Sequence, residues 1–326
     1  MPSRLLVGVD IGGTKTAVLD SLEPPAVLER IEFPTRPSRG PDPAIEQIKQ
    51  GIRELLSKHL SAGVELGAIG VSCGSPLDPI RGVIQAPPNL STWIDVPITS
   101  ILEQEFGVKC ELENDANAGA VAEHRFGAGQ GCRHMIFITM GTGFGAGIIA
   151  DGRLYRGAND MAGEIGHVRL TRTGPIGYHK AGSAEGWASG GGMAQVAAQV
   201  VAAARRRREQ TVLSDVAKRG RAITARDVGL AAQRGDAVAL RIVRSTGHRL
   251  GEALAILVDL FNPERIVIGG LAMRLGDLLL EPALRVIRRE ALPISAETCR
   301  IVPAALGERI GDIAALSIAM GLPGRR

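Results

Sequence analysis

A carboxylate beside an amide lies in the run Glu113-Asn114-Asp115-Ala116-Asn117-Ala118. Hydrophobic periodicity predicts a short strand before this run and a helix over residues 115–126. Phosphoryl transfer to an alcohol needs little covalent chemistry from a protein, but it needs a carboxylate that orients the hydroxyl and accepts its proton. Asp115 has the type and position for that role, and Asn114 could bind a second hydroxyl. The structural alternative is that one of these two side chains only caps the helix.

A pair of glycines lies between two apolar segments, in the run Asp10-Ile11-Gly12-Gly13-Thr14-Lys15. The spacing of a P-loop is absent, and a Rossmann fingerprint would need a helix after the glycines. A tight turn between strands can still offer bare backbone N–H groups to an anion, beside the Thr14 hydroxyl and the Lys15 cation. Asp10 could hold Mg²⁺ directly or through water. A plain hairpin turn is the alternative.

A second glycine cluster, Gly141 to Gly147, follows another apolar strand and includes Thr142 and Gly143. So much glycine between two strands destabilises them unless something approaches the backbone closely. A bend or bulge is the alternative. Two such turns at matching places suggest a polyphosphate bound by both, and Gly269-Gly270, after a further strand, is a candidate third contact.

Glu164 and His167 lie three residues apart, and Glu185 follows later in the chain. These side chains could bind a metal ion or hydrogen-bond a polyol. The sequence contains no H-E-x-x-H motif and no cysteine cluster, which disfavours a zinc site of their own. Glu185 precedes an Ala/Gly-rich segment and could simply cap a helix there.

The elements that must position these candidates indicate an α/β protein. Residues 5–19 predict a strand, a glycine turn and a second strand, and residues 137–149 loosely repeat that order. A long helix is predicted over residues 236–261, with an apolar stripe that faces a core. The length of 326 residues favours two domains.

Composition excludes several classes of protein. No apolar run approaches the length of a membrane span, and the N-terminus runs into a strand without the layout of a signal peptide. The four cysteines form no C-x-x-C pair, so we expect reduced thiols and a cytoplasmic location. The net charge is only +4, and the basic run from Arg205 to Arg208 fits a helix C-terminus better than a nucleic-acid site.

Taken together, the motifs resemble the ROK family of sugar kinases and repressors, within the actin-like ATPase superfamily. They are, in the family's order, DIGGTK (10–15), PPNLSTW (87–93), ENDANA (113–118), GTGFGAG (141–147), GEIGH (163–167), AEGWASG (184–190) and VIGG (267–270). The resemblance implies a two-lobed α/β fold of the actin-like ATPase (ribonuclease H-like) type, with the active site in the cleft between the lobes. It places the smaller lobe at residues 1–115 plus about 305–326 and the larger lobe at 116–304.

The resemblance also implies roles for particular residues. Asp115 would be the catalytic base, and Asp10 would lie on the Mg²⁺ side of the site. Sugar hydroxyls would be bound by Asp115 itself and by Asn89, Asn114, Glu164, His167 and Glu185. Phosphate and nucleotide contacts would fall to Gly12, Gly13, Thr14, Lys15, Thr142, Gly143, Gly269 and Gly270.

Two departures from the family pattern affect these expectations. Most relatives hold a structural zinc ion with the histidine of GEIGH and three cysteines, whereas the corresponding positions here are Ile176, Tyr178 and Ser183. We therefore expect no structural zinc, with His167 free for the sugar. In the run Cys73-Gly74-Ser75-Pro76, Ser75 stands where relatives usually have a sugar-contacting glycine, so it is a further candidate sugar contact.

The resulting expectation is an ATP- and Mg²⁺-dependent hexose kinase, with glucose as the leading substrate and a homodimer as the assembly. Kinases of N-acetylmannosamine, N-acetylglucosamine, allose or fructose remain alternatives. A sugar-sensing repressor is disfavoured because only a few residues precede the first predicted strand, where family repressors carry a helix-turn-helix domain. A sugar-binding pseudokinase is disfavoured because Asp10, Asp115 and both glycine turns are present. No nucleic-acid or membrane partner is expected.

Overall fold

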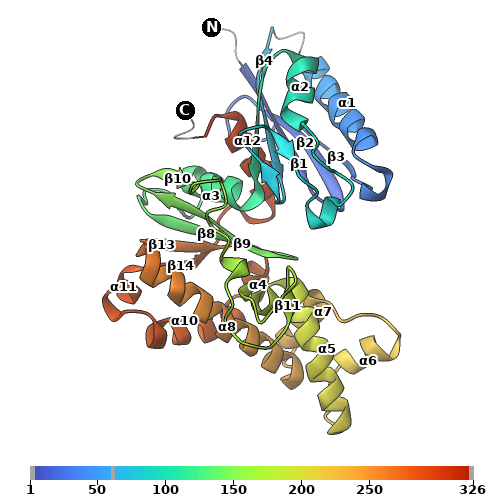
Figure 1. The fold of residues 1–326 in the computed structure, drawn as a ribbon. Helices are drawn as coiled ribbons and strands as arrows, with labels where there is room; N and C mark the ends of the chain where they lie inside the picture. The colour runs from blue at the N-terminus through green and yellow to red at the C-terminus, as the bar shows by residue number, and fades with distance from the viewer. Residues whose placement is uncertain (1–3, 60–62, 323–326) are drawn as a thin grey trace. The chain divides into compact units, whose positions relative to one another are not determined.

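The computed structural model describes residues 4–59 and 63–322, and it divides into two compact units (Figure 1). Unit 1 comprises residues 1–131, 152–162 and 306–326, and unit 2 comprises residues 132–151 and 163–305. Residues 116–131 and 152–162 therefore group with unit 1 by their contacts. The lobe boundaries implied by the family resemblance stay a prediction.

Unit 1 is built on a five-stranded sheet. Its strands, in spatial order, are β3 (Arg30–Pro34), β2 (Lys15–Ser21), β1 (Arg4–Ile11), β4 (Glu65–Cys73) and β7 (Lys109–Asn114). The last three are parallel, and their ends coincide because Ile11 pairs with Cys73 and Cys73 with Asn114. The residues that follow these strands consequently meet at one edge of the sheet, where open α/β sheets bind ligands.

Helices cover both faces of this sheet. Helices α1 (Asp42–His59) and α2 (Ile98–Phe106) pack on one face, where Val9 and Ile48 share a core cluster. Helix α12 (Ile310–Ala319) packs on the other face, where Leu316 lies against Leu19. Alternate side chains of each strand thus supply two apolar layers. Helix α12, at the end of the described chain, lies beside β1, the first strand of the chain (Figure 1).

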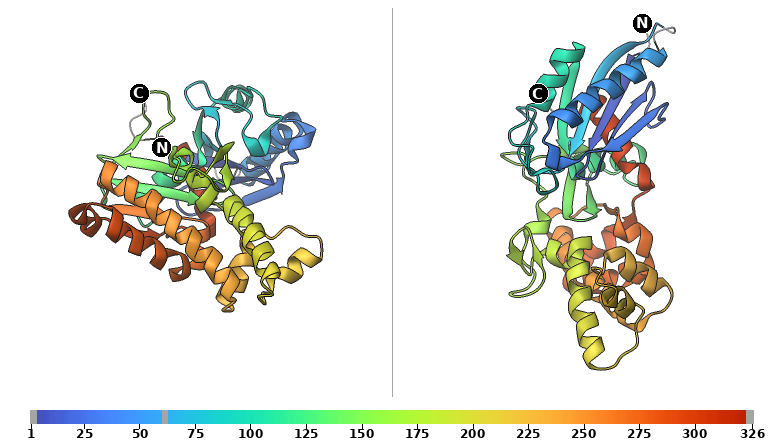
Figure 2. Two further views of the ribbon diagram at one scale, coloured as in Figure 1. Left: turned by 60° about the horizontal axis from the view of Figure 1, so that its bottom comes forward. Right: turned by 90° about the vertical axis from the view of Figure 1, so that its right-hand side faces the viewer.

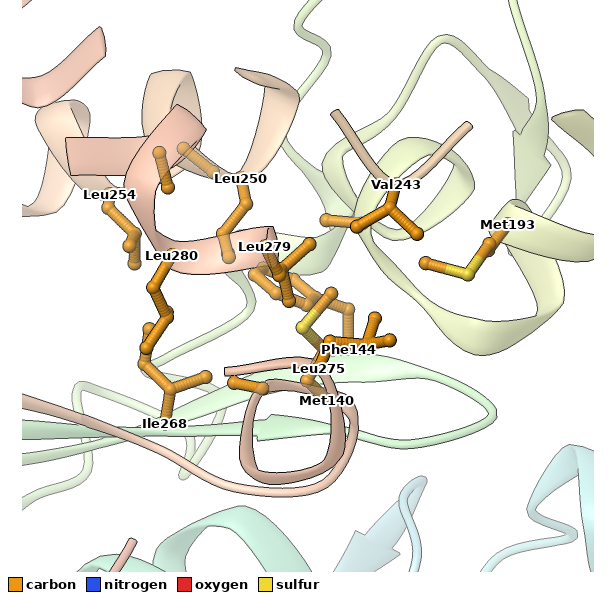
Figure 3. Close-up of a cluster of buried hydrophobic side chains, with 14 of the residues drawn as sticks. Met140, Phe144, Met193, Val243, Leu250, Leu254, Ile268, Leu275, Leu279 and Leu280 are labelled. Atoms are coloured by element: carbon orange, nitrogen blue, oxygen red, sulfur yellow. The ribbon is translucent and has the colours of Figure 1, made fainter. Parts of the chain in front are cut away.

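Unit 2 contains a second sheet, in the order β9 (Phe144–Ala150), β8 (Met135–Met140), β13 (Arg265–Ile268) and β14 (Arg300–Pro303). Strands β8, β13 and β14 are parallel, and β8 pairs antiparallel with β9. Helices α8 (Ala237–Phe261) and α10 (Asp277–Glu290) run side by side (Figures 1 and 2). Their residues Leu250, Leu254 and Leu279 pack with Met140 and Ile268 of the sheet (Figure 3). Each such buried side chain stabilises the fold by about 1.5–3 kcal/mol.

The remaining elements are short or connect these layers. The strands are β5 (Leu77–Asp78), β6 (Val83–Ile84), β10 (Arg153–Tyr155), β11 (Ile176–Gly177) and β12 (Lys180–Ala181). The α-helices are α3 (Asp115–Phe126), α4 (Ala184–Ala188), α5 (Gly190–Arg206), α6 (Leu213–Lys218), α7 (Ala225–Gln233), α9 (Leu271–Leu275) and α11 (Pro293–Thr298). The 3₁₀ turns are η1 (Pro37–Arg39), η3 (Pro88–Leu90), η4 (Ile165–His167) and η5 (Gly307–Arg309). None of the helices described is both long and apolar enough to cross a bilayer.

Local sequence signals account for most of these boundaries. The predicted helix over 236–261 is confirmed, because the Asp236 side chain accepts the Ala239 N–H (2.9 Å) and left-handed Asn262 ends it. The basic run begins at the end of α5, as predicted. One expectation was wrong in extent: the second glycine loop is limited to residues 141–143, since Phe144 already pairs with Met140 as the first residue of β9. The stabilisation of the strand by cross-strand pairing of Phe144 is larger than its destabilisation by the neighbouring glycines.

Candidate active site

A cavity of about 150 Å³ opens at the edge of the unit 1 sheet where β1, β4 and β7 end. Asp10 and the turn after β1 form one wall, and the segment Cys73–Ser75 after β4 forms the next. Asp115 closes the side that follows β7. The full lining is Asp10, Ile11, Gly12, Gly13, Cys73, Gly74, Ser75, Pro87, Pro88, Asn89, Leu90 and Asp115. The sheet register and the turn Pro88–Leu90 together bring six of the predicted site residues to this cavity from four separate segments.

Asp115 and Asn114 have divided roles at the start of α3. The Asn114 side chain caps the helix, with its Oδ1 accepting the N–H of Asn117 (2.7 Å). Asp115 is the first residue of α3 and is not the cap. Its Oδ1 accepts the N–H of Ala116 (2.8 Å), so Oδ2 is the oxygen available to a ligand hydroxyl. Because the cap uses only Oδ1 of Asn114, the side-chain NH₂ group can still donate hydrogen bonds to a ligand.

The carboxylates at this cavity have raised pKa values. Water reaches Asp115 from the cavity, but the surrounding protein removes much of its hydration, and this burial raises its pKa. Burial also raises the pKa of Asp10, to about 6, and the negative charges of Asp115 and Asp312 add to the effect. The Cys73 thiol beside them has its pKa raised by burial, which keeps it protonated and unreactive. Carboxylates that repel one another in a cavity favour a cation there.

The turn after β1 is fixed by hydrogen bonds that its glycines permit. The N–H of Gly12 donates to the Lys15 carbonyl (3.0 Å), and Thr35 Oγ1 donates to the Gly12 carbonyl (2.6 Å). A Cβ on Gly13 would lie 2.6 Å from the Cβ of Asn89, so only glycine allows this contact. Gly13 thus holds the predicted sugar contact Asn89 at the cavity.

Thr14 and Lys15 are the two residues of the motif that do not line the cavity. The carbonyl of Thr14 accepts the N–H of Thr35 (3.1 Å). Lys15 is exposed and its Nζ pairs with Glu32 of β3 (2.8 Å). A phosphate contact by Lys15 would require it to leave Glu32, which costs little because exposed ion pairs contribute only about 0–1 kcal/mol.

In unit 2, the glycine turn 141–143 lies against one of the predicted sugar ligands. The N–H of Gly141 donates to the Gly143 carbonyl (3.1 Å), and the N–H of Phe144 donates to Glu185 Oε2 (3.3 Å). Glu185 does not cap a helix, because the Ser183 and Ser189 side chains cap α4 and α5. Its carboxylate is instead directed to the turn.

Gly269 and Gly270 follow β13 beside the same turn. The N–H of Gly269 donates to the Ile138 carbonyl (2.9 Å). Gly270 has φ +66°, and a Cβ there would lie 2.1 Å from the Met140 carbonyl oxygen. Left-handed geometry and this close approach both require glycine. The predicted nucleotide contacts Thr142, Gly143 and Gly270 are therefore neighbours within unit 2.

Glu164 precedes η4, His167 is its last residue, and both are exposed. The turn is joined to α4, which carries Glu185, by the N–H of Ala184 donating to the Val168 carbonyl (2.8 Å). Lys180 Nζ donates to the His167 carbonyl (2.8 Å). These bonds hold the second group of predicted sugar ligands on one framework.

The positions at which the family resemblance would place zinc ligands have other partners here. Ile176 is bonded through its N–H and carbonyl to the Gln195 side chain (2.9 and 2.8 Å). The Tyr178 ring lies edge-on to His167, with centroids 6.1 Å apart. Ser183 caps α4. Within residues 4–59 and 63–322, no three His, Cys, Asp or Glu side chains are grouped as metal ligands.

Sequence reasoning missed three side chains that act on the site. Asp312 raises the pKa of Asp10 across the sheet, and Arg30 binds Asp312 (2.9 Å). Gln195 fastens the loop at Ile176. No local pattern could reveal them, because each contacts residues distant in the sequence.

Comparisons with known proteins found relatives over nearly the whole chain. The ROK family model matches residues 6–321. A glucokinase of Halalkalibacterium halodurans is 36% identical over 315 residues, which are 96% of this chain and 94% of that protein. The structure of a ROK hexokinase from Thermus thermophilus is 32% identical and covers 96% of this chain and 97% of its own, with a TM-score of 0.77. A ROK glucokinase from Streptomyces griseus, solved with glucose and AMPPNP, is also 32% identical and covers 97% of this chain and 99% of its own, with a TM-score of 0.77. These similarities confirm the expected actin-like ATPase fold.

Proposed function

The chain belongs to the ROK family, and on that premise we propose that it phosphorylates glucose with ATP, yielding glucose 6-phosphate and ADP. The observation that carries this proposal is the placement of Asp115 on the unit 1 cavity, with one carboxylate oxygen bonded to the backbone and the other available. The glucokinases of Halalkalibacterium and Streptomyces, similar over nearly the whole chain, support the choice of sugar and of phosphoryl donor.

In the proposed reaction, Asp115 orients the C6 hydroxyl of glucose for in-line attack on the γ-phosphorus and accepts its proton. The bond between that phosphorus and the β–γ bridging oxygen breaks, and ADP leaves. The raised pKa of Asp115 makes it a better proton acceptor than an ordinary carboxylate. We assign the other sugar hydroxyls to Ser75, Asn89, Asn114, Glu164, His167 and Glu185, and the nucleotide to Gly12, Gly13, Thr14, Lys15, Thr142, Gly143, Gly269 and Gly270.

Asp10 is the proposed Mg²⁺-side residue, directly or through water. The electrostatics of the cavity fit a divalent cation. Asp10 is buried beside the negative charges of Asp115 and Asp312, and the positive charges of Arg30 and Lys15 offset this repulsion only in part. When bound with ATP, Mg²⁺ neutralises charge on the phosphate oxygens. Asp10 has to be ionised to hold it, so we expect metal affinity to fall below about pH 6.

A coupled assay of ADP release over a panel of sugars tests the substrate assignment. We expect the highest kcat/KM for glucose among glucose, mannose, allose, fructose, N-acetylglucosamine and N-acetylmannosamine. A higher kcat/KM for an N-acetylhexosamine would replace glucose kinase by the corresponding amino-sugar kinase. Release of ADP that does not depend on any sugar would contradict a sugar kinase altogether.

We expect the purified protein to contain no stoichiometric zinc, because Ile176, Tyr178 and Ser183 offer no zinc thiolates. Hydrogen bonds of Gln195 and Lys180 fasten the same loop. Elemental analysis should therefore find well under one zinc per chain, and EDTA should leave the melting temperature unchanged in the absence of Mg²⁺. About one zinc per chain, lost together with stability on chelation, would refute this expectation.

The assembly and location follow from the resemblance and from composition. We propose a homodimer, which light scattering of the purified chain would test against a monomer mass of 34.3 kDa. We also propose a cytoplasmic location, which is consistent with Cys73, Cys110, Cys132 and Cys299 all being free thiols.

A further inference from the structure

A buried ion pair lies directly behind the proposed catalytic residues. Glu113, the residue before Asn114-Asp115, has a side chain only 1% exposed, and its Oε2 lies 2.5 Å from Nη1 of Arg156. Arg156 is itself only 16% exposed, and its Nη1 also lies 3.2 Å from Oδ1 of Asp160. Burying such charges is costly unless each is paired. The proposed mechanism uses none of the three.

The other oxygen of Glu113 fixes the strand-to-helix junction. Its Oε1 accepts the N–H of Asn114 (2.9 Å) and the side-chain amide of Asn117 (3.0 Å). Asn117 in turn donates its own N–H to the Asn114 cap (2.7 Å). One carboxylate therefore holds the backbone immediately before Asp115 and the first turn of the helix that carries it.

Arg156 comes from outside this junction. It lies in the segment 152–162, just after β10, and that segment belongs to unit 1 by its contacts. A guanidinium is always charged, so Arg156 supplies the positive charge that the buried carboxylate of Glu113 requires. Through Arg156 the segment makes a charged contact with Glu113 at the junction.

We propose that Arg156 is a positioning residue for phosphoryl transfer, acting through Glu113 to hold Asp115 and Asn114 in the geometry that the reaction needs. The proposal rests on the proposed function for its kinetic part. Arg156 is not among the residues that line the cavity. Its loss would let Glu113 turn away from the Asn114 N–H, and a displacement of about 1 Å at the reacting groups can cost about 10²-fold in rate.

The test compares Arg156→Gln and Arg156→Lys with Arg153→Gln as a matched control, because Arg153 is an exposed arginine on β10 in the same segment. We expect Arg156→Gln to lower kcat with glucose by about 10- to 100-fold, while KM for ATP stays within about twofold of the parent value. Lysine keeps a charge for Glu113 and should restore much of kcat. Arg153→Gln should equal the parent. A folded Arg156→Gln protein with the parental kcat, or lysine and glutamine variants with equal kcat, would overturn the proposal.

Hydrogen–deuterium exchange of the peptide 109–120 gives a readout that needs no activity. Arg156→Gln should accelerate exchange at the start of α3, and Arg153→Gln should not. Unchanged exchange would overturn the proposal, whereas faster exchange in a chain without glucose kinase activity would reject only the proposed function. If Arg156→Gln does not fold, Glu113→Gln/Arg156→Gln removes both buried charges. That double variant should fold, with kcat at least about fivefold below the parent, and a parental kcat would again overturn the proposal.

Discussion

Replacement of Asp115 by asparagine is expected to lower kcat for glucose phosphorylation by about 10²- to 10⁴-fold, the usual contribution of a general base. Asparagine keeps the size of the side chain and can still accept the Ala116 N–H through its carbonyl oxygen. It cannot take the proton of the sugar hydroxyl. Because the cavity walls stay in place, KM for ATP should change little. Initial rates by the coupled ADP assay, with circular dichroism as a check of folding, measure the effect.

Asp277→Asn is the matched control for this substitution. Asp277 is the first residue of α10, as Asp115 is of α3, but it does not line the cavity. Both changes remove a negative charge from a helix N-terminus, where it contributes about 0.3–1 kcal/mol. We expect Asp277→Asn to keep the parental kcat. Substantial turnover by a folded Asp115→Asn protein would exclude Asp115 as the base.

The second large effect is expected from Asp10→Asn, which should stabilise the metal-free protein while it abolishes productive Mg²⁺·ATP binding. The carboxyl has a pKa of about 6 in the folded chain against 3.8 for the ordinary group. The folded state therefore binds more protons than the unfolded state between those two values, so stability falls as the pH rises from about 4 to about 6. Above pH 6 the carboxyl of Asp10 is ionised, and it then lowers the free energy of unfolding by its full amount, at most about 3 kcal/mol.

Urea unfolding measures this second prediction at two pH values. At pH 7.5 Asp10→Asn should raise the free energy of unfolding by about 1–3 kcal/mol, and near pH 4 the gain should nearly vanish. In the Asp115→Asn background the gain should be smaller, because one of the repelling charges has gone. Asp277→Asn provides the control for loss of an exposed carboxylate. A destabilised Asp10→Asn protein at pH 7.5 would show that the carboxylate contributes stability, contrary to the electrostatics described above.

The sequence predicted the parts of the molecule that depend on local patterns. Strand, turn and strand at residues 5–19 could be read from apolar runs and glycines, and Asn114 was one of two expected caps. The extent of the second glycine loop was not predictable, because pairing between Phe144 and Met140 decides it. The resemblance supplied the set of site residues, and the structure adds which of them are neighbours within each unit.

Long-range contacts explain the rest of what the sequence did not predict. Arg156 meets Glu113 because the segment 152–162 groups with unit 1, and nothing in its own residues indicates a buried partner. Asp312 acts on Asp10 because α12 packs against the sheet that carries β1. Lys15 belongs to the motif by spacing, yet its side chain pairs with Glu32 on the neighbouring strand. Such effects arise from tertiary contacts between residues far apart in the sequence, and local sequence patterns do not predict these contacts.

The most direct test of the central claim is phosphorus NMR of the products that the purified chain forms from glucose and Mg²⁺·ATP. We predict one glucose 6-phosphate for each ADP, with both products reduced together to trace amounts in Asp115→Asn. ADP accompanied by inorganic phosphate in place of a sugar phosphate, or equal glucose 6-phosphate formation by Asp115→Asn, would contradict the account.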